Sequence, residues 1–109
     1  MATLTKEASK IIRKGDPTAK IVSASTTLRL ESAYEKFFPP YLKALKKDKW
    51  PVDAIAVHSY PDGQGNPGTR ADLISQVKVQ LKKSKVPSSQ ALWDTEVNYG
   101  TKGPRKKIK

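Results

Sequence analysis

Apolar side chains recur at helical spacing in three segments of this chain and form short β-type runs in three others. The helical stripes run from Leu4 to Ile12, from Tyr34 to Leu45 and from Leu73 to Leu81. The β-type runs cover residues 19–25, residues 52–57, and a stretch that begins at Ala91 and ends on Glu96. The elements therefore alternate as α-β-α-β-α-β, which predicts an α/β fold with three parallel strands alternating with helices.

Turn and capping residues indicate where these elements end. Gly15 and Asp16-Pro17 predict the end of a first helix over residues 5–14. Pro39-Pro40 predicts a break in the second helical region, because proline lacks an N–H and disfavours helical geometry in the residue before it. We expect a polar turn over residues 26–29 and a capping box over residues 69–72. No internal sequence repeat is evident beyond the spacing of the strands.

Candidate catalytic side chains lie where the last two predicted strands end. One strand ends in His58-Ser59-Tyr60, and the next ends on Glu96. Because the carboxyl ends of parallel strands meet at one rim of a sheet, we expect Glu96, His58 and Tyr60 to lie together. A glutamate there can act as the nucleophile of a retaining glycosidase, with His58 and Tyr60 binding sugar hydroxyls or orienting the carboxylate. The alternatives are an exposed loop glutamate beside a structural histidine and a core tyrosine.

Further polar and aromatic side chains surround these strand ends. Trp93 is a candidate platform for stacking a sugar ring, although a tryptophan inside a strand more often serves packing. By alternation with Trp93 along the strand, we expect Asp94 to point away from the pocket side that some of its neighbours share, and we assign Asp94 no catalytic role. A glycine-rich loop carries Asp62, Gln64 and Asn66, which can contact a substrate or simply form the turn.

Two motifs resemble the clan A glycoside hydrolases, which are (β/α)8 barrels. Val57-His58-Ser59-Tyr60-Pro61 is similar to the end of their sixth strand. Trp93-Asp94-Thr95-Glu96 is similar to the end of their seventh strand, whose glutamate is the catalytic nucleophile. The resemblance covers about residues 4–100 and implies a partial (β/α)8 (TIM) barrel built from strands five to seven. It also implies a carbohydrate substrate, Glu96 as the nucleophile, and His58, Tyr60 and Trp93 as substrate-binding residues.

The same resemblance implies an incomplete site. The acid/base glutamate of the clan follows an asparagine, and no Asn-Glu pair occurs in this sequence. A complete barrel needs roughly 200 residues or more, whereas this chain has 109. We therefore expect a catalytically incomplete fragment, with one domain over residues 1–100 and a basic, disordered tail over residues 101–109. The unclosed sheet of such a fragment would expose strand edges and an apolar face, which predicts self-association.

Composition limits the remaining classes of function. The chain has no cysteine and a single histidine, so disulfides, thiolate sites and multi-histidine metal sites are excluded, and we predict no metal or cofactor. No apolar run approaches the roughly 18–20 residues of a membrane span, so we predict no membrane partner. No signal peptide is visible at the start of the sequence; a longer parent protein could still be secreted, which leaves the compartment open.

The net charge of +11 raises an alternative function, the binding of polyanions such as nucleic acid by a non-enzymatic basic module. The distribution of the charge argues against nucleic acid as a partner. Five basic residues lie in the last eight positions, and most other lysines fall at predicted helix ends, where they complement the helix dipole. We therefore favour the glycosidase interpretation and keep polyanion binding as the alternative.

Overall fold

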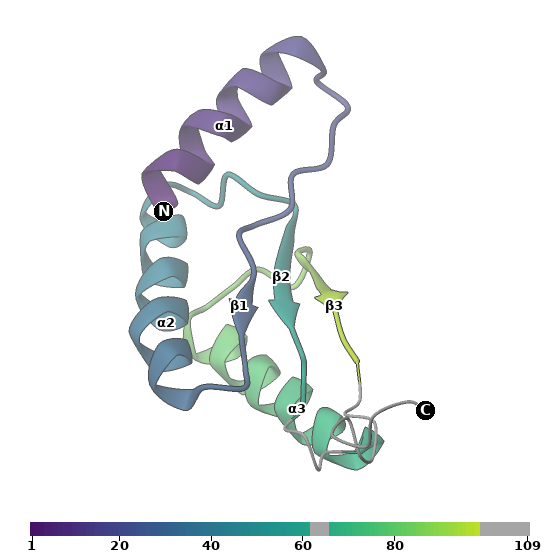
Figure 1. Cartoon of the computed structure of the whole chain (residues 1–109). Coiled ribbons are helices and arrows are strands. Elements are labelled where there is room, and N and C mark those ends of the chain that lie inside the picture. The colour runs from purple at the N-terminus through teal and green to yellow at the C-terminus, as the bar shows by residue number, and fades with distance from the viewer. Residues whose placement is uncertain (62–65, 99–109) are drawn as a thin grey trace.

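The computed structural model describes residues 1–61 and 66–98, which form a small α/β domain with an open, three-stranded parallel sheet (Figure 1). The strands are β1 (Thr26–Thr27), β2 (Ala54–His58) and β3 (Ala91–Glu96), in the spatial order β1-β2-β3. The helices are α1 (Ala2–Gly15), α2 (Glu31–Lys47) and α3 (Pro67–Lys83). The predicted element order and the parallel strands are confirmed. Over the described residues, no helix is both long and apolar enough to cross a membrane.

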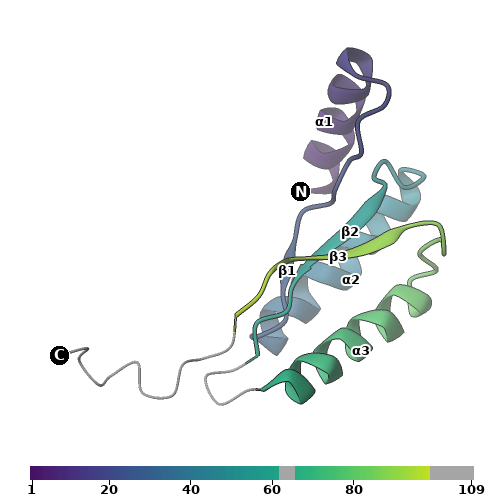
Figure 2. The same cartoon turned by 90° about the vertical axis from the view of Figure 1, so that its right-hand side faces the viewer.

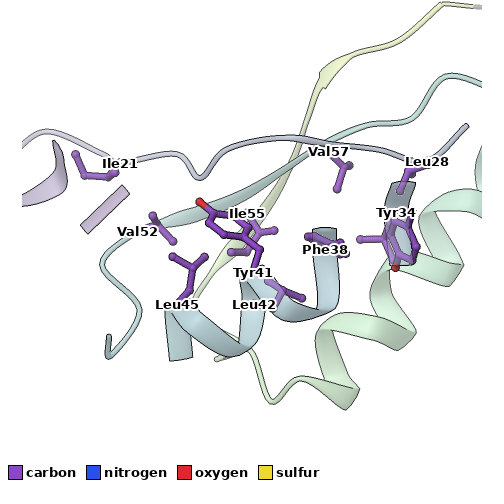
Figure 3. Close-up of a cluster of buried hydrophobic side chains, with 11 residues drawn as sticks. Ile21, Leu28, Tyr34, Phe38, Tyr41, Leu42, Leu45, Val52, Ile55 and Val57 are labelled. Atoms are coloured by element: carbon purple, nitrogen blue, oxygen red, sulfur yellow. The ribbon is translucent and has the colours of Figure 1, made fainter. Parts of the chain in front are cut away.

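Helices α2 and α3 cover one face of the sheet, and no described helix covers the opposite face (Figure 2). Between the helices and the sheet lies a core of buried apolar side chains (Figure 3). It contains Phe38 and Leu42 of α2, Ile55 and Val57 of β2, and Val77 of α3, all fully buried. The alternation of β2 therefore places Ile55 and Val57 toward the helices and Ala54, Ala56 and His58 on the other side.

The predicted break at Pro39-Pro40 is wrong, because α2 continues through both prolines. An interior proline costs a helix about 3 kcal/mol relative to alanine. Burying a large apolar side chain contributes about 1.5–3 kcal/mol. Phe38 lies just before the prolines, and Tyr41, Leu42 and Leu45 lie just after them, all buried on the same side of α2. Their shared burial outweighs the local preference of the prolines.

The first strand also lies later in the chain than predicted. Residues 19–25 run beside β2, but their only bridge is Val22 to Ala54, and regular pairing begins where we expected a polar turn. There, Thr26 pairs with Val57 and Thr27 with His58. Asp53 N–H donates to Ile21 O at 2.7 Å, and Ser23 N–H donates to Ala54 O at 2.9 Å, so irregular bonds attach this segment to β2 before the ladder starts.

Two helix starts differ from the prediction as well. Helix α1 begins at Ala2 rather than Thr5, and Gly15 is its last residue, with Asp16 as the C-cap. Helix α3 begins at Pro67, because Asn66 rather than Thr69 is the N-cap. The Asn66 side chain accepts from Thr69 N–H at 3.1 Å, and Thr69 Oγ1 accepts from Asn66 N–H at 3.4 Å. The capping box therefore lies three residues earlier than expected.

Polar contacts attach α1 to the rest of the domain. Lys6 binds Asp48 at 3.0 Å, Ser9 Oγ donates to Pro51 O at 2.5 Å, and Arg13 binds Asp53 at 2.9 Å. The predicted apolar stripe instead faces outward, since Leu4 is 65% exposed and Ile11 is 70% exposed. No other described segment of this chain covers that stripe.

Candidate functional site

Glu96 is the last residue of β3, at the carboxyl edge of the sheet. The neighbouring strand β2 ends at His58, and Tyr60 follows two residues later. Tyr60 Oη donates a 2.8 Å hydrogen bond to Glu96 Oε2, and His58 Nδ1 lies 3.8 Å from the same oxygen. At that separation the imidazole forms an ion pair with Glu96 whenever it is protonated. The three side chains lie together as expected, and the glutamate remains 55% exposed.

A β-bulge gives Glu96 this position. Val57 pairs with Asp94, but the next residue of β2, His58, pairs with Glu96, so Thr95 is an extra residue in β3. By strict alternation Glu96 would share the helix side of the sheet with Asp94. One extra residue reverses the alternation, which places Glu96 beside His58.

Hydroxyl contacts hold the bulged residue. Thr95 Oγ1 lies 3.0 Å from Ser25 Oγ, ahead of β1, and 3.4 Å from the carbonyl oxygen of Val57 in β2. Thr95 therefore joins the segments before β1, in β2 and in β3 at the point where the chain turns Glu96 toward Tyr60. Neither Ser25 nor Thr95 was a predicted site residue, because a bulge has no signature in a single sequence.

The hydrogen bond to Glu96 changes the acidity of Tyr60. Donation to the Glu96 carboxylate is the main cause that raises the pKa of Tyr60 above its ordinary value, and partial burial and the charges of Glu96 and Asp94 add to it. The nearby positive charge of Arg29 acts in the opposite direction. Tyr60 therefore stays protonated at neutral pH and remains a hydrogen-bond donor to the carboxylate.

Arg29 is a rim residue that sequence reasoning missed. It follows β1, and its Nη2 donates to Pro61 O at 3.4 Å. Its positive charge acts to lower the pKa of Tyr60, so Arg29 places a cation near the sheet edge where Glu96 lies. The sequence offered a signal, an arginine just after a strand, but the strand was predicted too early and Arg29 was assigned to a turn.

Asp94 lies on the helix side of the sheet and is fully engaged there. Its carboxylate accepts from Arg70 Nη2 at 2.6 Å, and it also accepts from the N–H and hydroxyl of Ser59. Burial acts to raise the pKa of Asp94, but the bonds from Ser59 and Arg70 outweigh it and hold the pKa below its ordinary value. Asp94 is therefore ionised at neutral pH and unsuited to act as a general acid.

Trp93 lines a hollow that includes none of the other predicted site residues. It pairs with Ala56 and is 48% exposed on the face away from α2 and α3. The hollow, of about 420 Å³, also includes Lys20, Val22, Gln90 and Ala91 but none of His58, Tyr60 and Glu96. Asn66 caps α3, and Asp62 and Gln64 lie outside the described residues.

The described residues contain no cluster of three or more histidine, cysteine, aspartate or glutamate side chains that could hold a metal ion. The candidate site is therefore a carboxylate with a hydroxyl donor and an imidazole beside it. No protein-family model, curated protein or solved structure matches this chain. The interpretation of the site therefore depends on its own geometry and chemistry.

Proposed function

We propose that this chain carries the nucleophile of a retaining glycoside hydrolase, with Glu96 attacking the anomeric carbon of a glycoside or polysaccharide. The observation that carries the proposal is the 2.8 Å bond from Tyr60 to Glu96 Oε2, made at the carboxyl edge of a parallel sheet. A retaining mechanism needs an ionised carboxylate with a fixed orientation. A tyrosine hydroxyl that stays protonated can fix one oxygen and leave the other to attack.

The surroundings of Glu96 suit this role. The carboxylate is half exposed, so a sugar can reach it, and His58 lies 3.8 Å from the oxygen that Tyr60 binds. Arg29 adds positive charge at the same rim, where its charge acts on Tyr60. In the first step the Glu96 oxygen would form a bond to the anomeric carbon while the bond to the leaving oxygen breaks. Water would then release the sugar from the enzyme.

We further propose that these elements form part of a (β/α)8 barrel and that the acid/base group comes from outside the described residues. Asp94 is bound to Arg70 and Ser59. Asp53, which directly precedes β2, is bound to Arg13 and to the N–H of Ile21. Both carboxylates are engaged in structural contacts. The sheet face that bears Trp93 and the stripe of α1 that bears Ile11 are uncovered, as expected of surfaces that pack against further barrel units.

Substrates that need no acid can test the nucleophile by itself. A 2-deoxy-2-fluoroglycoside with a dinitrophenolate leaving group requires no protonation, so a competent Glu96 should form a stable glycosyl ester. Peptide mass mapping across a panel of sugars should place the adduct on Glu96. The variant Glu96→Gln should form no adduct, whereas Glu35→Gln, an exposed carboxylate on α2, should be labelled as the wild type is. An adduct on another carboxylate would remove the assignment.

A further inference from the structure

The same seven-residue pattern occurs at the C-terminal ends of α2 and α3 and continues past the last helical residue of each. The apolar periodicity that predicts the helices does not show this pattern. Residues 45–51 read Leu-Lys-Lys-Asp-Lys-Trp-Pro, and residues 81–87 read Leu-Lys-Lys-Ser-Lys-Val-Pro. The expectation that the chain has no internal repeat is therefore wrong at these two helix ends. Each copy carries three lysines within four positions.

Both copies fold into the same helix C-cap. In α2, Trp50 N–H donates to Leu45 O at 2.8 Å and Lys49 N–H donates to Lys46 O at 3.0 Å. In α3, Val86 N–H donates to Leu81 O at 3.0 Å and Lys85 N–H donates to Lys82 O at 3.0 Å. These are the paired bonds of the Schellman motif, and the proline that follows stops the helix.

The third lysine of each copy occupies a position that usually belongs to glycine. Lys49 has φ of 59° and Lys85 has φ of 57°, both in the left-handed region. A side chain strains the backbone in this conformation, whereas glycine adopts it without a steric clash. Both copies nevertheless carry lysine, so a positive charge stands at the same place on both helix ends despite the backbone cost.

One groove is lined by lysines from both helix ends, with Lys46 from the first copy of the pattern and Lys83 and Lys85 from the second. We call it the lysine groove; it measures about 290 Å³ and is lined by Pro39, Lys43, Lys46, Lys83, Ser84 and Lys85. The four lysines are exposed, and none pairs with a carboxylate in residues 1–61 and 66–98. A second hollow that shares Lys43 and Lys46 continues onto Lys47. The helix dipole favours cations on each helix separately, but it does not require both sets to share one groove.

Acidic residues are missing from this region. The sequence contains no aspartate or glutamate between Glu35 and Asp48, or between Asp72 and Asp94. Asp48, inside the first copy of the pattern, is bound by Lys6 at 3.0 Å. The positive charge of the groove is therefore not neutralised within the described part of the chain, and an external anion would relieve the repulsion between its lysines.

Contrary to the expectation from the charge distribution along the sequence, we propose that the lysine groove binds the phosphate backbone of double-stranded nucleic acid without reading its sequence. Its lining offers ammonium groups beside a proline and a serine, with neither an arginine for bidentate contacts nor an aromatic ring for stacking. Such a lining favours a ligand with a high density of negative charge rather than one of a particular shape. Duplex nucleic acid carries one negative charge per roughly 1.7 Å of its axis, and lysine binds phosphate as a point charge. The lysine groove includes none of the residues of the Glu96 site, so this second function is independent of the proposed glycosidase chemistry.

Binding of a fluorescent 20-bp duplex by the full chain, followed by anisotropy at several salt concentrations, tests the proposal. If the four lysines each neutralise one phosphate, the slope of log K against log salt should include about −3.6 from the groove. The quadruple variant Lys43→Gln, Lys46→Gln, Lys83→Gln and Lys85→Gln should lose that part of the slope and about tenfold or more in affinity at low salt. The matched variant with glutamine at Lys10, Lys14, Lys20 and Lys36 removes the same charge elsewhere and should keep the slope.

Each outcome of this experiment has a defined meaning. Circular dichroism should show that both variants are folded as the wild type is. Equal losses of affinity in the two variants would show that the chain binds duplex through its net charge alone, and would contradict the proposed binding site. Absence of salt-sensitive binding by the wild type would do the same, and tighter binding of a sulfated polysaccharide than of duplex would overturn the assignment to nucleic acid.

Discussion

Arg70 and Asp94 connect the start of α3 to the strand that carries the candidate nucleophile, with Nη2 of the arginine 2.6 Å from Oδ2 of the aspartate. The same carboxylate accepts from Ser59, which follows β2. Asp94 is only 14% exposed, so water screens these bonds weakly. Three elements are thus joined two residues before Glu96, which helps to fix the end of β3.

Replacing Asp94 with asparagine should lower the free energy of unfolding by about 1–3 kcal/mol, because charged hydrogen bonds to Arg70 and Ser59 are lost. Since the folded pKa of Asp94 lies below its ordinary value, its contribution is present above the unfolded pKa of about 3.9 and is lost as pH falls through the folded pKa. Urea unfolding at pH 6 and pH 3 measures this, with the exposed Glu35→Gln as control. A difference between wild type and Asp94→Asn that grows on acidification would contradict the ion pair.

Removing the Glu96 charge should lower the pKa of Tyr60 toward the ordinary value of about 10, because the carboxylate bond is the largest cause of its upward shift. Tyrosinate absorbance followed against pH in Glu96→Gln measures this shift, and Tyr60→Phe identifies which part of the signal belongs to Tyr60. Tyr60→Phe should also slow fluoroglycoside labelling about tenfold, the effect of one hydrogen bond on a barrier. An unchanged Tyr60 titration in Glu96→Gln would mean that the two groups do not interact in solution.

Two core tyrosines should respond in opposite ways to loss of their hydroxyls. Tyr41 Oη contacts Thr5 Oγ1 at 2.8 Å and accepts from Ala24 N–H at 3.1 Å, so Tyr41→Phe should cost about 1–2 kcal/mol. The hydroxyl of Tyr34 is buried and has no hydrogen-bond partner within the described residues, so Tyr34→Phe should leave stability unchanged or raise it by up to about 1 kcal/mol. Thermal unfolding of the pair tests the packing of α2, and a larger loss for Tyr34→Phe would be inconsistent with it.

Replacement by glycine should stabilise the fold at Lys85 and destabilise it at Lys82. Lys85→Gly relieves a left-handed side chain and should raise the free energy of unfolding by about 0.5–1 kcal/mol. Lys82→Gly places the same residue within the last turn of α3 and should lower it by about 1 kcal/mol. Chemical denaturation of both variants measures the difference. Destabilisation by both would show that Lys85 does not take this conformation in solution.

Trp93 should promote self-association of the isolated chain, because it is 48% exposed on a sheet face that no described helix covers. Trp93→Thr keeps a β-forming residue and should shift sedimentation velocity profiles toward monomer. Val79→Thr removes an exposed apolar side chain from α3 and serves as the control, with no expected change. If both variants associate as the wild type does, the uncovered face is not the contact surface.

The order of the elements, the parallel strands and the position of Glu96 at the same sheet edge as His58 and Tyr60 are predictable from the sequence. These features follow from local causes. Apolar periodicity defines each element, and helical crossovers between parallel strands place the carboxyl ends of the strands at one edge. The placement of Asp94 on the face opposite Trp93 follows in the same way, from alternation along a single strand.

Features that depend on contacts between distant segments of the chain could not be predicted from the sequence. Burial against β2 and α3 keeps α2 continuous through Pro39-Pro40, because its free energy exceeds the local cost of the prolines. The register between β2 and β3 inserts Thr95 as a bulge and turns Glu96 toward Tyr60. The arrangement of α2 beside α3 gathers lysines of the two helices, 37 to 42 residues apart in the sequence, into one groove. Local propensity does not encode such pairings, because their energy arises only when the segments meet.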